Sequence, residues 1–351
     1  MFFQKKIGLD LGTANTLVYV VGEGIVLHEP TVVAYSLEDK RIVAVGEEAR
    51  EMLGRTPGSI IASRPMKEGV IADYRTTAAM ITYFLKKALK GRVFWPQMVI
   101  SIPGGASQVE KRAVVSACKQ AGASDVYLME ESLAAAIGAK IPISQASGNM
   151  IVNIGGGTTE VAIISLGQLV AYKTVRVAGT KFDEAILNHM RKKHNLIIGE
   201  RTAEDIKIKI GNALIEPFST SAVEERSGKT AEVNKVGEKT MEVKGRDLIT
   251  GVPKTVSLTS LEVNEALLET IGAIVEVVRI ALENTDPEVA SDLVDKGIVM
   301  AGGGSLLHGL DKLLSKDTGL PVRIAEDPLL CVVKGAGKVL ENFDFYREAL
   351  M

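Results

Sequence analysis

The chain has 351 residues, 46% of them hydrophobic and 24% charged, which is enough for two ordinary globular domains. Its 41 basic and 43 acidic residues give a formal net charge of −2, so there is no general electrostatic attraction to nucleic acid. Two cysteines, Cys118 and Cys331, and four scattered histidines form no disulfide framework or zinc spacing, which favours a reducing, cytosolic compartment.

Two short strands are predicted near the start, at residues 6–11 and 16–21, around the turn Gly12-Thr13-Ala14-Asn15. The same pattern returns later, with strands at 150–154 and 160–164 around the turn Gly155-Gly156-Gly157-Thr158. Asp10 and Asn153 hold matching positions, 143 residues apart. The simplest interpretation is an internal duplication of one α/β unit, which predicts two similar halves facing each other across a cleft.

Helices fill the intervals between these strands. Asp73 is expected to cap a helix that ends near Gly91. Ser107 with Glu110, and Thr259 with Glu262, have the spacing of capping boxes, and they predict helices reaching to about residues 121 and 284. We interpret all three helices as scaffold.

A third glycine-rich turn, Ala301-Gly302-Gly303-Gly304-Ser305, follows an apolar strand at 297–300 and precedes a helix predicted from Leu306. Glycines at strand ends let backbone N–H groups approach an anion, and a helix N-terminus adds partial positive charge. We expect the first two turns to hold a polyphosphate and the third to hold its nucleoside. The turns lack the Rossmann and P-loop fingerprints, which argues against a dehydrogenase and a P-loop NTPase.

In this order and spacing the three turns resemble the phosphate and adenosine motifs of the actin, sugar-kinase and heat-shock-chaperone superfamily. Within that superfamily the sequence is most similar to the MreB/Mbl family of bacterial actin homologues. The similarity covers nearly the whole chain, and it is carried by residues 7–16, 45–49, 69–74, 134–139 and 199–204.

The resemblance implies an α/β, actin-like ATPase fold with two duplicated RNase H-like domains around a nucleotide cleft, each with a smaller subdomain. The large subdomain IA is expected at residues 1–32, 66–145 and about 321–351, and the small subdomain IB at 33–65. The large subdomain IIA is expected at 146–180 and about 250–320, and the small subdomain IIB at 181–249.

Candidate roles follow for individual residues. Asp10 lies beside the first phosphate turn, where an acid needs a cation, so we expect Asp10 and Asn153 to contact Mg²⁺ through water; the alternative for Asp10 is an Asx turn. By resemblance, Glu131 polarises the water that attacks the γ-phosphate of ATP, rather than its neighbour Glu130. The alternative is an acid that complements the helix dipole.

Thr158 is expected to hydrogen-bond that water or the γ-phosphate, unless it only satisfies its own turn. By resemblance, Glu204 and Lys207, which are three residues apart on one helical face, reach the ribose and adenine together with Gly302, Gly303, Gly304 and Ser305. The alternative for Glu204 and Lys207 is a solvated ion pair.

Three positions depart from the family pattern. Asn153 and Thr180 stand where Asp is usual, and Ser132 replaces a Pro after the paired acids. Asn cannot supply negative charge to a Mg²⁺-water shell, so we expect ATP binding with weak hydrolysis coupled to polymerisation. Residues 219–246 are rich in charge and longer than the family's hairpin, which predicts a solvated hairpin or loop.

Val93, Phe94 and Trp95 follow basic residues in a loop, a pattern that suits insertion at a lipid headgroup boundary and resembles the family's membrane loop. The alternative is packing at the start of a strand at 98–102. The N-terminal residues are too few for a signal peptide, and no apolar run spans a membrane, so the chain is expected to be cytoplasmic and peripheral on the inner face of the membrane.

The resemblance further implies self-assembly into head-to-tail protofilaments in antiparallel pairs, contact with membrane-bound morphogenesis proteins, and a role in cell-wall organisation and rod shape. Three alternatives remain. A small-molecule kinase would need a sugar site in the cleft, and a chaperone would need a large substrate domain beyond these 351 residues. A non-polymerising ATP-binding adaptor is the third.

Overall fold

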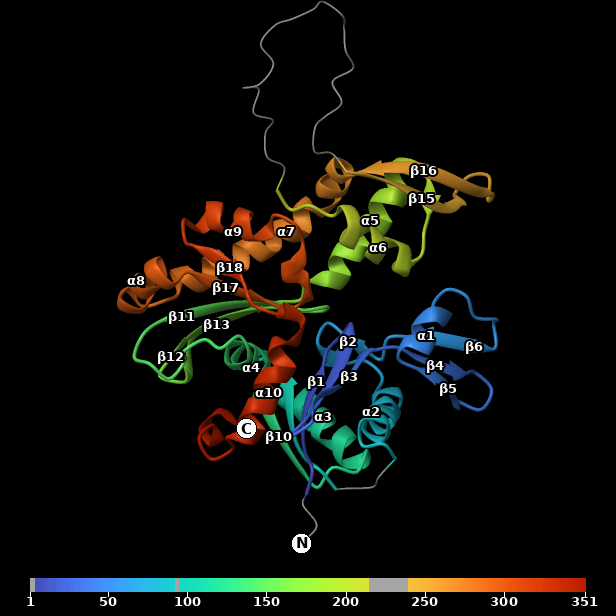
Figure 1. The fold of residues 1–351 in the computed structure, drawn as a ribbon. Coiled ribbons are helices and arrows are strands. Elements are labelled where there is room, and N and C mark those ends of the chain that lie inside the picture. The colour runs from blue at the N-terminus through green and yellow to red at the C-terminus, as the bar shows by residue number, and fades with distance from the viewer. Residues whose placement is uncertain (1–3, 92–94, 215–238) are drawn as a thin grey trace, which may run out of the picture.

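Two five-stranded sheets with the same strand order form the frame of the molecule (Figure 1). The computed structural model describes residues 4–91, 95–214 and 239–351. The first sheet has the order β3-β2-β1-β9-β10, with strands Gly24–Pro30, Asn15–Val20, Lys6–Leu11, Gln97–Ile102 and Asp125–Glu130. The second has the order β13-β12-β11-β17-β18, with strands Gln168–Val175, Thr159–Ser165, Asn149–Ile154, Ile298–Ala301 and Val322–Ile324.

The two sheets repeat each other in register as well as in order. Asp10 of β1 pairs with Leu17 of the antiparallel β2, and Asn153 of β11 pairs with Glu160 of the antiparallel β12. In both sheets the central strand is also paired, in parallel, with a strand from far along the chain. The predicted internal duplication is therefore confirmed.

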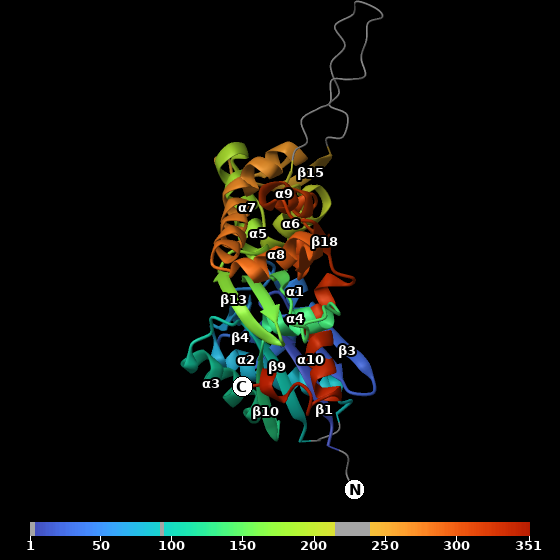
Figure 2. The ribbon, with the colours of Figure 1, turned by 90° about the vertical axis from the view of Figure 1, so that its left-hand side faces the viewer.

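Helices α4 (Glu131–Gly138) and α10 (Cys331–Glu341) lie between the two sheets and share one apolar core with both of them. Helices α2 (Tyr74–Ala88) and α3 (Gln108–Gln120) cover the outer face of the first sheet. The long α7 (Ser260–Glu283) covers the outer face of the second sheet, and α5 (Gly179–His194) packs beside it. Figure 2 shows these layers stacked from α3 to α7.

The predicted helix starts are confirmed by their caps. The Asp73 side chain accepts a hydrogen bond from the Thr76 N–H at 3.1 Å, which fixes the start of α2. Both capping boxes are complete, at the start of α3 and at the start of α7. Each such cap contributes about 0.5–2 kcal/mol to helix stability.

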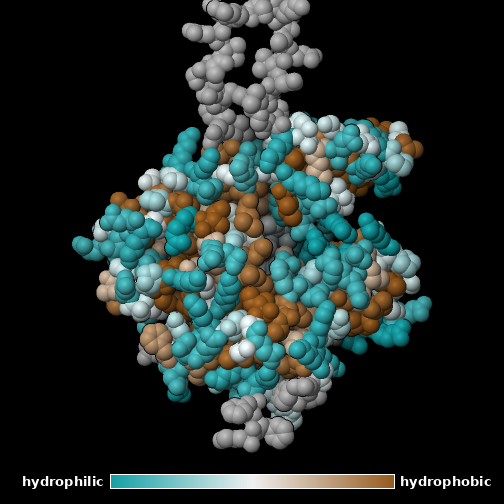
Figure 3. Space-filling view, in the orientation of Figure 1, coloured by the Kyte–Doolittle hydropathy of each residue, from teal (hydrophilic) through white to brown (hydrophobic). Residues whose placement is uncertain are grey.

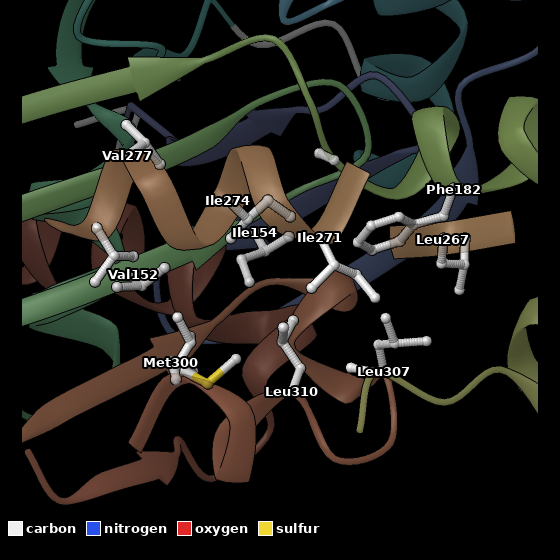
Figure 4. Packing of buried hydrophobic residues seen from close by; sticks show 14 of the residues in the cluster. Val152, Ile154, Phe182, Leu267, Ile271, Ile274, Val277, Met300, Leu307 and Leu310 are labelled. Atoms are coloured by element: carbon white, nitrogen blue, oxygen red, sulfur yellow. The ribbon is translucent and has the colours of Figure 1, made fainter. Parts of the chain in front are cut away.

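The core behind the second sheet is built from β-strands and helices whose apolar sides face one another. Figure 4 shows Ile154 and Met300 from the sheet meeting Ile271 of α7, Phe182 of α5 and Leu310 of α9 (Leu310–Thr318). All five side chains are at most 3% exposed, and burying each contributes about 1.5–3 kcal/mol. Both cysteines are buried and unpaired.

Two small three-stranded sheets extend from the frame. One has the order β5-β4-β6 (Ile42–Val45, Val33–Ser36 and Ile60–Ser63) and carries α1 (Glu47–Met52), and the hairpin β7-β8 (Met66–Lys67 and Val70–Ile71) follows it. The other has the order β14-β15-β16 (Leu196–Ile197, Thr240–Asp247 and Pro253–Thr259) and carries α6 (Glu200–Ile210). The charged segment predicted at 219–246 thus contributes residues 240–246 to β15, while residues 219–238 lie outside the described chain.

The pairing of two strands differs from the expected subdomain boundaries. Strand β16 belongs to the small sheet, although residues from about 250 were assigned to the large subdomain IIA. Strand β18 lies in the second sheet, although residues from about 321 were assigned to the first half. In each case backbone pairing continues past the boundary that the resemblance implied. The remaining boundaries stay a prediction.

The predicted start of the helix at Leu306 is wrong. Residues 303–306 form a short 3-10 turn, and α9 begins only at Leu310, after Gly309 adopts a φ of 76°. The third glycine-rich turn is therefore followed by a tight turn and not by a helix N-terminus. The other short elements are α8 (Pro287–Lys296) and two 3-10 turns at Pro328–Leu330 and Arg347–Ala349. Within the described ranges, no helix has the length and apolar character needed to cross a membrane.

Candidate functional site

The two duplicated turns close in the same way. The Gly12 N–H donates to the Asn15 carbonyl at 3.1 Å, and the Gly155 N–H donates to the Thr158 carbonyl at 2.9 Å. A side chain at Gly12 would bring a Cβ within 2.7 Å of the Asn15 oxygen, which is closer than real Cβ contacts. The first turn therefore needs glycine at this position.

The two turns also meet each other across the cleft. A Cβ at Gly156 would lie 2.7 Å from the Ala14 Cβ, and a Cβ at Gly157 would collide with Thr13. The Thr13 hydroxyl accepts a hydrogen bond from the Gly69 N–H at 2.9 Å. The sequence thus correctly predicts that equivalent turns from the two halves come together.

Several backbone donors in these turns are left free. In the part of the chain that the structure describes, the N–H groups of Thr13, Ala14, Gly156 and Gly157 donate no hydrogen bond to another protein group. Unpaired N–H groups in successive residues form concave sites that attract anions. This donor set fits the oxygens of a polyphosphate.

Strand alternation brings the acidic side chains to the same layer. Gly8 of β1 contacts Ala336 and Gly337 of α10, so Asp10, two residues further on, is on the side of the sheet that faces the central helices. Ile151 of β11 packs in the core shared with α4, so Asn153 also faces that layer. Helix α4 begins there, with Glu131 as its first residue.

Hydrogen bonds order these side chains. The Asn153 amide donates to Glu131 Oε1 at 2.9 Å, and the Ser101 hydroxyl donates to Asp10 Oδ1 at 3.3 Å. Glu131, rather than Glu130, is therefore the acid of the pair that contacts Asn153. Among the described residues, Asn153 Oδ1 has no hydrogen-bond partner although it is buried. A buried amide oxygen without a donor fits a bound water or a hydrated cation.

Glu160 is an acidic residue that the sequence analysis missed. It is fully buried at the start of β12, and its Oε1 accepts hydrogen bonds from the Gly104 N–H and the Tyr172 hydroxyl, both at 2.9 Å. The sequence did contain a signal for Glu160. It is a single acid that precedes the apolar strand Val161–Ile164, where burying a charge is costly unless it has a function or a partner.

The pKa of each of these acids is raised, mainly by burial and, for Asp10 and Glu160, also by the charge of Glu131. Burial, with the nearby charge of Glu131, raises the pKa of Asp10 to about 8 and the pKa of Glu160 to about 8. Burial also raises the pKa of Glu131, against the hydrogen bond from Asn153. Three crowded carboxyl groups next to free N–H donors fit a cation that bridges acids and phosphate.

The third turn lies against the second one. A Cβ at Gly304 or at Gly302 would collide with Ile154, and Gly302 has a φ of 79° that only glycine adopts readily. Ser305 is fully buried, and its hydroxyl donates to the Gly302 carbonyl at 2.6 Å. The structure thus joins the second and third turns, although the serine hydroxyl is used internally.

Glu204 and Lys207 form separate contacts. Lys207 pairs with Asp183 at 2.8 Å and donates to the Gly179 carbonyl at 3.1 Å, beside the second turn. Glu204 pairs with Arg50 of α1 at 2.9 Å, across the cleft. The expected contacts of both residues with a nucleoside stay a prediction.

The positions that depart from the family pattern have different environments. The Thr180 hydroxyl and N–H both donate to the Gly156 carbonyl at 2.8 Å, so Thr180 ties α5 to the second turn in a way that an Asp carboxylate could not. The Ser132 hydroxyl is buried, with no hydrogen-bond partner in the described ranges. Of the three residues predicted to contact a membrane, Trp95 is 71% exposed, while Val93 and Phe94 lie outside the described residues.

A hollow opens on the surface between the two small sheets. Figure 3 shows the surface indented on its right-hand side, between the lobe of β15–β16 and the lobe of β4–β6. The turn between β1 and β2 and the turn between β11 and β12 lie where the two halves meet.

Comparison with known proteins decides the family. The family described as MreB/Mbl protein matches residues 4–348. This chain belongs to the MreB/Mbl family. The resemblance seen in the sequence is therefore confirmed.

Relatives within the MreB/Mbl family are similar over nearly their whole length. The cell shape-determining protein Mbl of Bacillus subtilis (strain 168) is 46% identical over 343 residues, which cover 97% of each protein. The cell shape-determining protein MreB of Escherichia coli (strain K12) is 47% identical over 350 residues, which cover 98% of this chain and 95% of that protein.

Solved structures confirm the predicted actin-like fold. The crystal structure of MreB5 of Spiroplasma citri bound to ADP has a TM-score of 0.88 and 34% identity, with 99% of both chains covered. The same protein bound to AMPPNP has a TM-score of 0.86. The MamK double helical filament, at 21% identity, has a TM-score of 0.77 over 96% of this chain and 99% of that one, and it supports the fold alone.

Proposed function

We propose that this chain is a cytoskeletal protein that binds ATP with Mg²⁺ in the cleft and polymerises into membrane-associated filaments, which organise cell-wall synthesis and rod shape. The observation that carries the nucleotide part is the meeting of two equivalent turns with free N–H donors beside Glu131 and the buried acids Asp10 and Glu160. Relatives at 46–47% identity are cell shape-determining proteins, and a relative at 34% identity was solved with ADP and with AMPPNP. These similarities support the cytoskeletal and nucleotide parts.

Each turn has its own task in this proposal. The N–H groups of residues 13–15 and 156–158 bind the phosphates from opposite halves, so nucleotide binding joins the halves. The third turn, Gly302 to Ser305, and the pair Glu204 and Lys207 hold the nucleoside. The subdomain division predicted from the sequence is retained here, with two exceptions. Residues 253–259 belong to the small sheet of the second half, and residues 322–324 belong to its large sheet.

Hydrolysis is proposed to be slow. Mg²⁺, when bound, supplies positive charge that neutralises the phosphates and the acids around Asp10 and Asn153. Glu131 orients the attacking water and accepts its proton, and the Thr158 hydroxyl holds that water or the γ-phosphate in line. Asn153 already donates a hydrogen bond to Glu131 Oε1, which favours the ionised acid but occupies one of its oxygens. It also withholds the charge that an Asp would give to the cation.

Assembly and location complete the proposal. Subunits stack head to tail, a contact that repeats without closing and so gives protofilaments, which lie in antiparallel pairs. The chain is cytoplasmic and peripheral, and it touches the inner membrane face through Val93, Phe94 and Trp95. Membrane-bound morphogenesis proteins are the proposed partners, and nucleic acid is not one.

Electron microscopy on lipid monolayers tests this function, with ATP, with a non-hydrolysable analogue and without nucleotide, while phosphate release is measured in parallel. Paired filaments with ATP and with the analogue, and slow phosphate release with ATP alone, are the expected results. If ATP binds but filaments are absent in every condition, the non-polymerising adaptor replaces the filament protein. A phosphate release that depends on an added sugar would instead identify a small-molecule kinase.

A further inference from the structure

Two of the four histidines lie together at the end of α5, away from the cleft. The ring centroids of His189 and His194 are 6.0 Å apart. Glu262, in the first turn of α7, faces them, with its Oε1 3.2 Å from His194 Nε2. One ligand atom from each of the three residues lies within 4.8 Å of the other two. Only the packing of α5 on α7 brings Glu262 to the histidines, so the sequence spacing gave no sign of the cluster (Figure 1).

Two ring nitrogens of this cluster lack a hydrogen-bond partner in the described chain. The Nε2 atoms of His189 and His194 are both buried, and neither has a hydrogen-bond partner within the described ranges. Leaving a buried ring nitrogen unpaired costs about 1–3 kcal/mol. Two such atoms beside a carboxylate fit a ligand that binds between them.

The capping box of α7 prepares Glu262 for this role. Glu262 Oε2 accepts a hydrogen bond from the Thr259 N–H at 3.1 Å, which fixes the carboxylate and leaves Oε1 directed at the imidazoles. Outer hydrogen bonds of this kind orient metal ligands in proteins.

We propose that His189, His194 and Glu262 form a binding site for a transition-metal ion, with Zn²⁺ as the best fit. Two imidazole nitrogens and one carboxylate oxygen are the ligand set of an open zinc site, in which water takes the fourth position. Mg²⁺ prefers oxygen ligands, so the proposed nucleotide-bound cation does not compete for this site.

The geometry requires only small side-chain movements. Bonds of about 2.0–2.2 Å to a tetrahedral Zn²⁺ place its ligand atoms about 3.5 Å apart, so each pair here, within 4.8 Å now, must close by at most about 1.3 Å. The side chains of His194 and Glu262 are 16% and 20% exposed, which gives an ion access from solvent. Once bound, the ion would fasten the end of α5 to the start of α7.

The ammonium group of Lys193 competes with a metal ion for the Glu262 carboxylate. Its ammonium lies 3.6 Å from Glu262 Oε1 and 2.8 Å from Glu265 Oε2. Glu265 can keep the ammonium when an ion takes the Glu262 oxygen. Removing the lysine charge should therefore strengthen metal binding, whereas removing either histidine should weaken it.

Isothermal titration of the untagged full chain with Zn²⁺ tests the site, and visible absorption of a Co²⁺ complex reports the coordination geometry. We expect one Zn²⁺ per chain and a tetrahedral Co²⁺ spectrum. His189→Gln and His194→Gln should each weaken binding by at least about tenfold, since even outer-shell changes cost that much. His308→Gln, at an exposed histidine elsewhere, is the matched control and should bind as the unmodified chain does.

A second variant protects the test against misfolding. Lys193→Gln changes an exposed side chain and should bind Zn²⁺ several-fold more tightly, an outcome that an unfolded variant cannot give. Zn²⁺ should also raise the melting temperature of the unmodified chain, but not that of His194→Gln. Equal Zn²⁺ affinity in the unmodified chain and both histidine variants, or no Zn²⁺ binding by the unmodified chain, would overturn the site.

Discussion

Asn153 lies beside the acidic residues of the site, and its side chain donates a hydrogen bond to Glu131. Asn153→Asp removes that bond and adds a fourth acid where Asp10 and Glu160 already have raised pKa values. Without Mg²⁺ we expect a loss of about 1–3 kcal/mol in the free energy of unfolding. With Mg²⁺ and ATP the loss should disappear, and phosphate release should rise several-fold.

Thermal unfolding in EDTA and in Mg²⁺-ATP, with phosphate release beside it, measures this difference. Asn149→Asp is the control, because it is buried in the same strand but lies 3.4 Å from the Lys296 ammonium, which would stabilise a carboxylate. A variant at 153 that is insensitive to Mg²⁺ would contradict the cation role given to this position.

Gly156 is the point at which the two phosphate turns touch. Gly156→Ala places a methyl group against the Ala14 N and Cβ, at 2.9 and 2.7 Å, so the turns must separate. We expect nucleotide affinity to fall by roughly tenfold or more, since overpacking costs about 1–3 kcal/mol. Titration with a fluorescent ATP analogue measures it. Gly58→Ala, in a turn with open space around it, should leave affinity unchanged, and equal affinity in both variants would refute the contact.

Trp95 is the single tryptophan of the chain, so its fluorescence reports one place. Its carbonyl is held by Gln4 and Ser124 at 3.2 and 3.1 Å, while its ring is 71% exposed. On anionic vesicles we expect the emission to shift to shorter wavelength. Trp95→Ser should weaken vesicle co-sedimentation by roughly tenfold, because burying a large apolar side chain contributes about 1.5–3 kcal/mol.

Ile249→Ser, at the exposed tip of the β15–β16 hairpin, is the control for surface apolarity and should co-sediment normally. Unshifted Trp95 emission from protein that does sediment with vesicles would place the membrane contact elsewhere.

At the scale of elements, the crossing of α4 and α10 decides where Glu131 stands. The helices approach so closely that a Cβ at Gly138 would overlap the Cys331 carbonyl, and a Cβ at Gly335 would overlap the Ala134 carbonyl. Small residues on both helices therefore allow backbone contact, and α4 carries Glu131 at its start.

Gly335→Ala should force these helices apart and lower the free energy of unfolding by about 2–3 kcal/mol. Urea unfolding measures the loss. Gly272→Ala, within α7 and with no atom within 4 Å of the added Cβ, should instead leave stability unchanged or raise it by about 0.4–1 kcal/mol. Equal responses of the two glycines would mean that the close crossing contributes nothing.

Features that are encoded by neighbouring residues, such as helix caps and glycine turns, were predictable from the sequence. Features that depend on contacts between distant residues were not. Thr259 and Glu262 mark the start of α7 within four residues, so the capping box was readable. The start of α9 was misplaced because Gly309 turns the chain first. In the site, the two glycine turns were readable from their repetition. Glu160 was missed because its partners Gly104 and Tyr172 come from other elements.

At the scale of the whole molecule, ion pairs connect the two halves across the cleft. Arg50 of α1 meets Glu204 of α6 at 2.9 Å, and Glu68 lies 3.6 Å from Arg176 and 3.8 Å from Lys181. These side chains are partly exposed, so each pair contributes at most about 1 kcal/mol and is screened by salt. The closed arrangement is therefore held weakly in the absence of a ligand.

Arg50→Gln removes one of these ion pairs and should shift the chain toward a more open cleft. We expect a larger radius of gyration in small-angle scattering without nucleotide, and added salt should bring the unmodified chain toward the variant. Nucleotide should restore the closed form in both. Arg41→Gln is the control, since Arg41 is 79% exposed and pairs only with Asp39 among the described residues. Identical scattering by the Arg50 variant and the unmodified chain would dismiss the pair as a closure contact.

The packing of β1 on α10 matters for the synthesis of the chain on the ribosome. A Cβ added at Gly8 would lie only 3.0 Å from the Gly337 nitrogen, so β1 packs closely on α10. An early strand is therefore covered by one of the last helices to emerge. Until residue 341 has left the exit tunnel, the inner faces of both sheets lack that cover. Nascent chains should therefore remain partly folded and prone to stick to one another through most of translation, which makes them substrates for general chaperones.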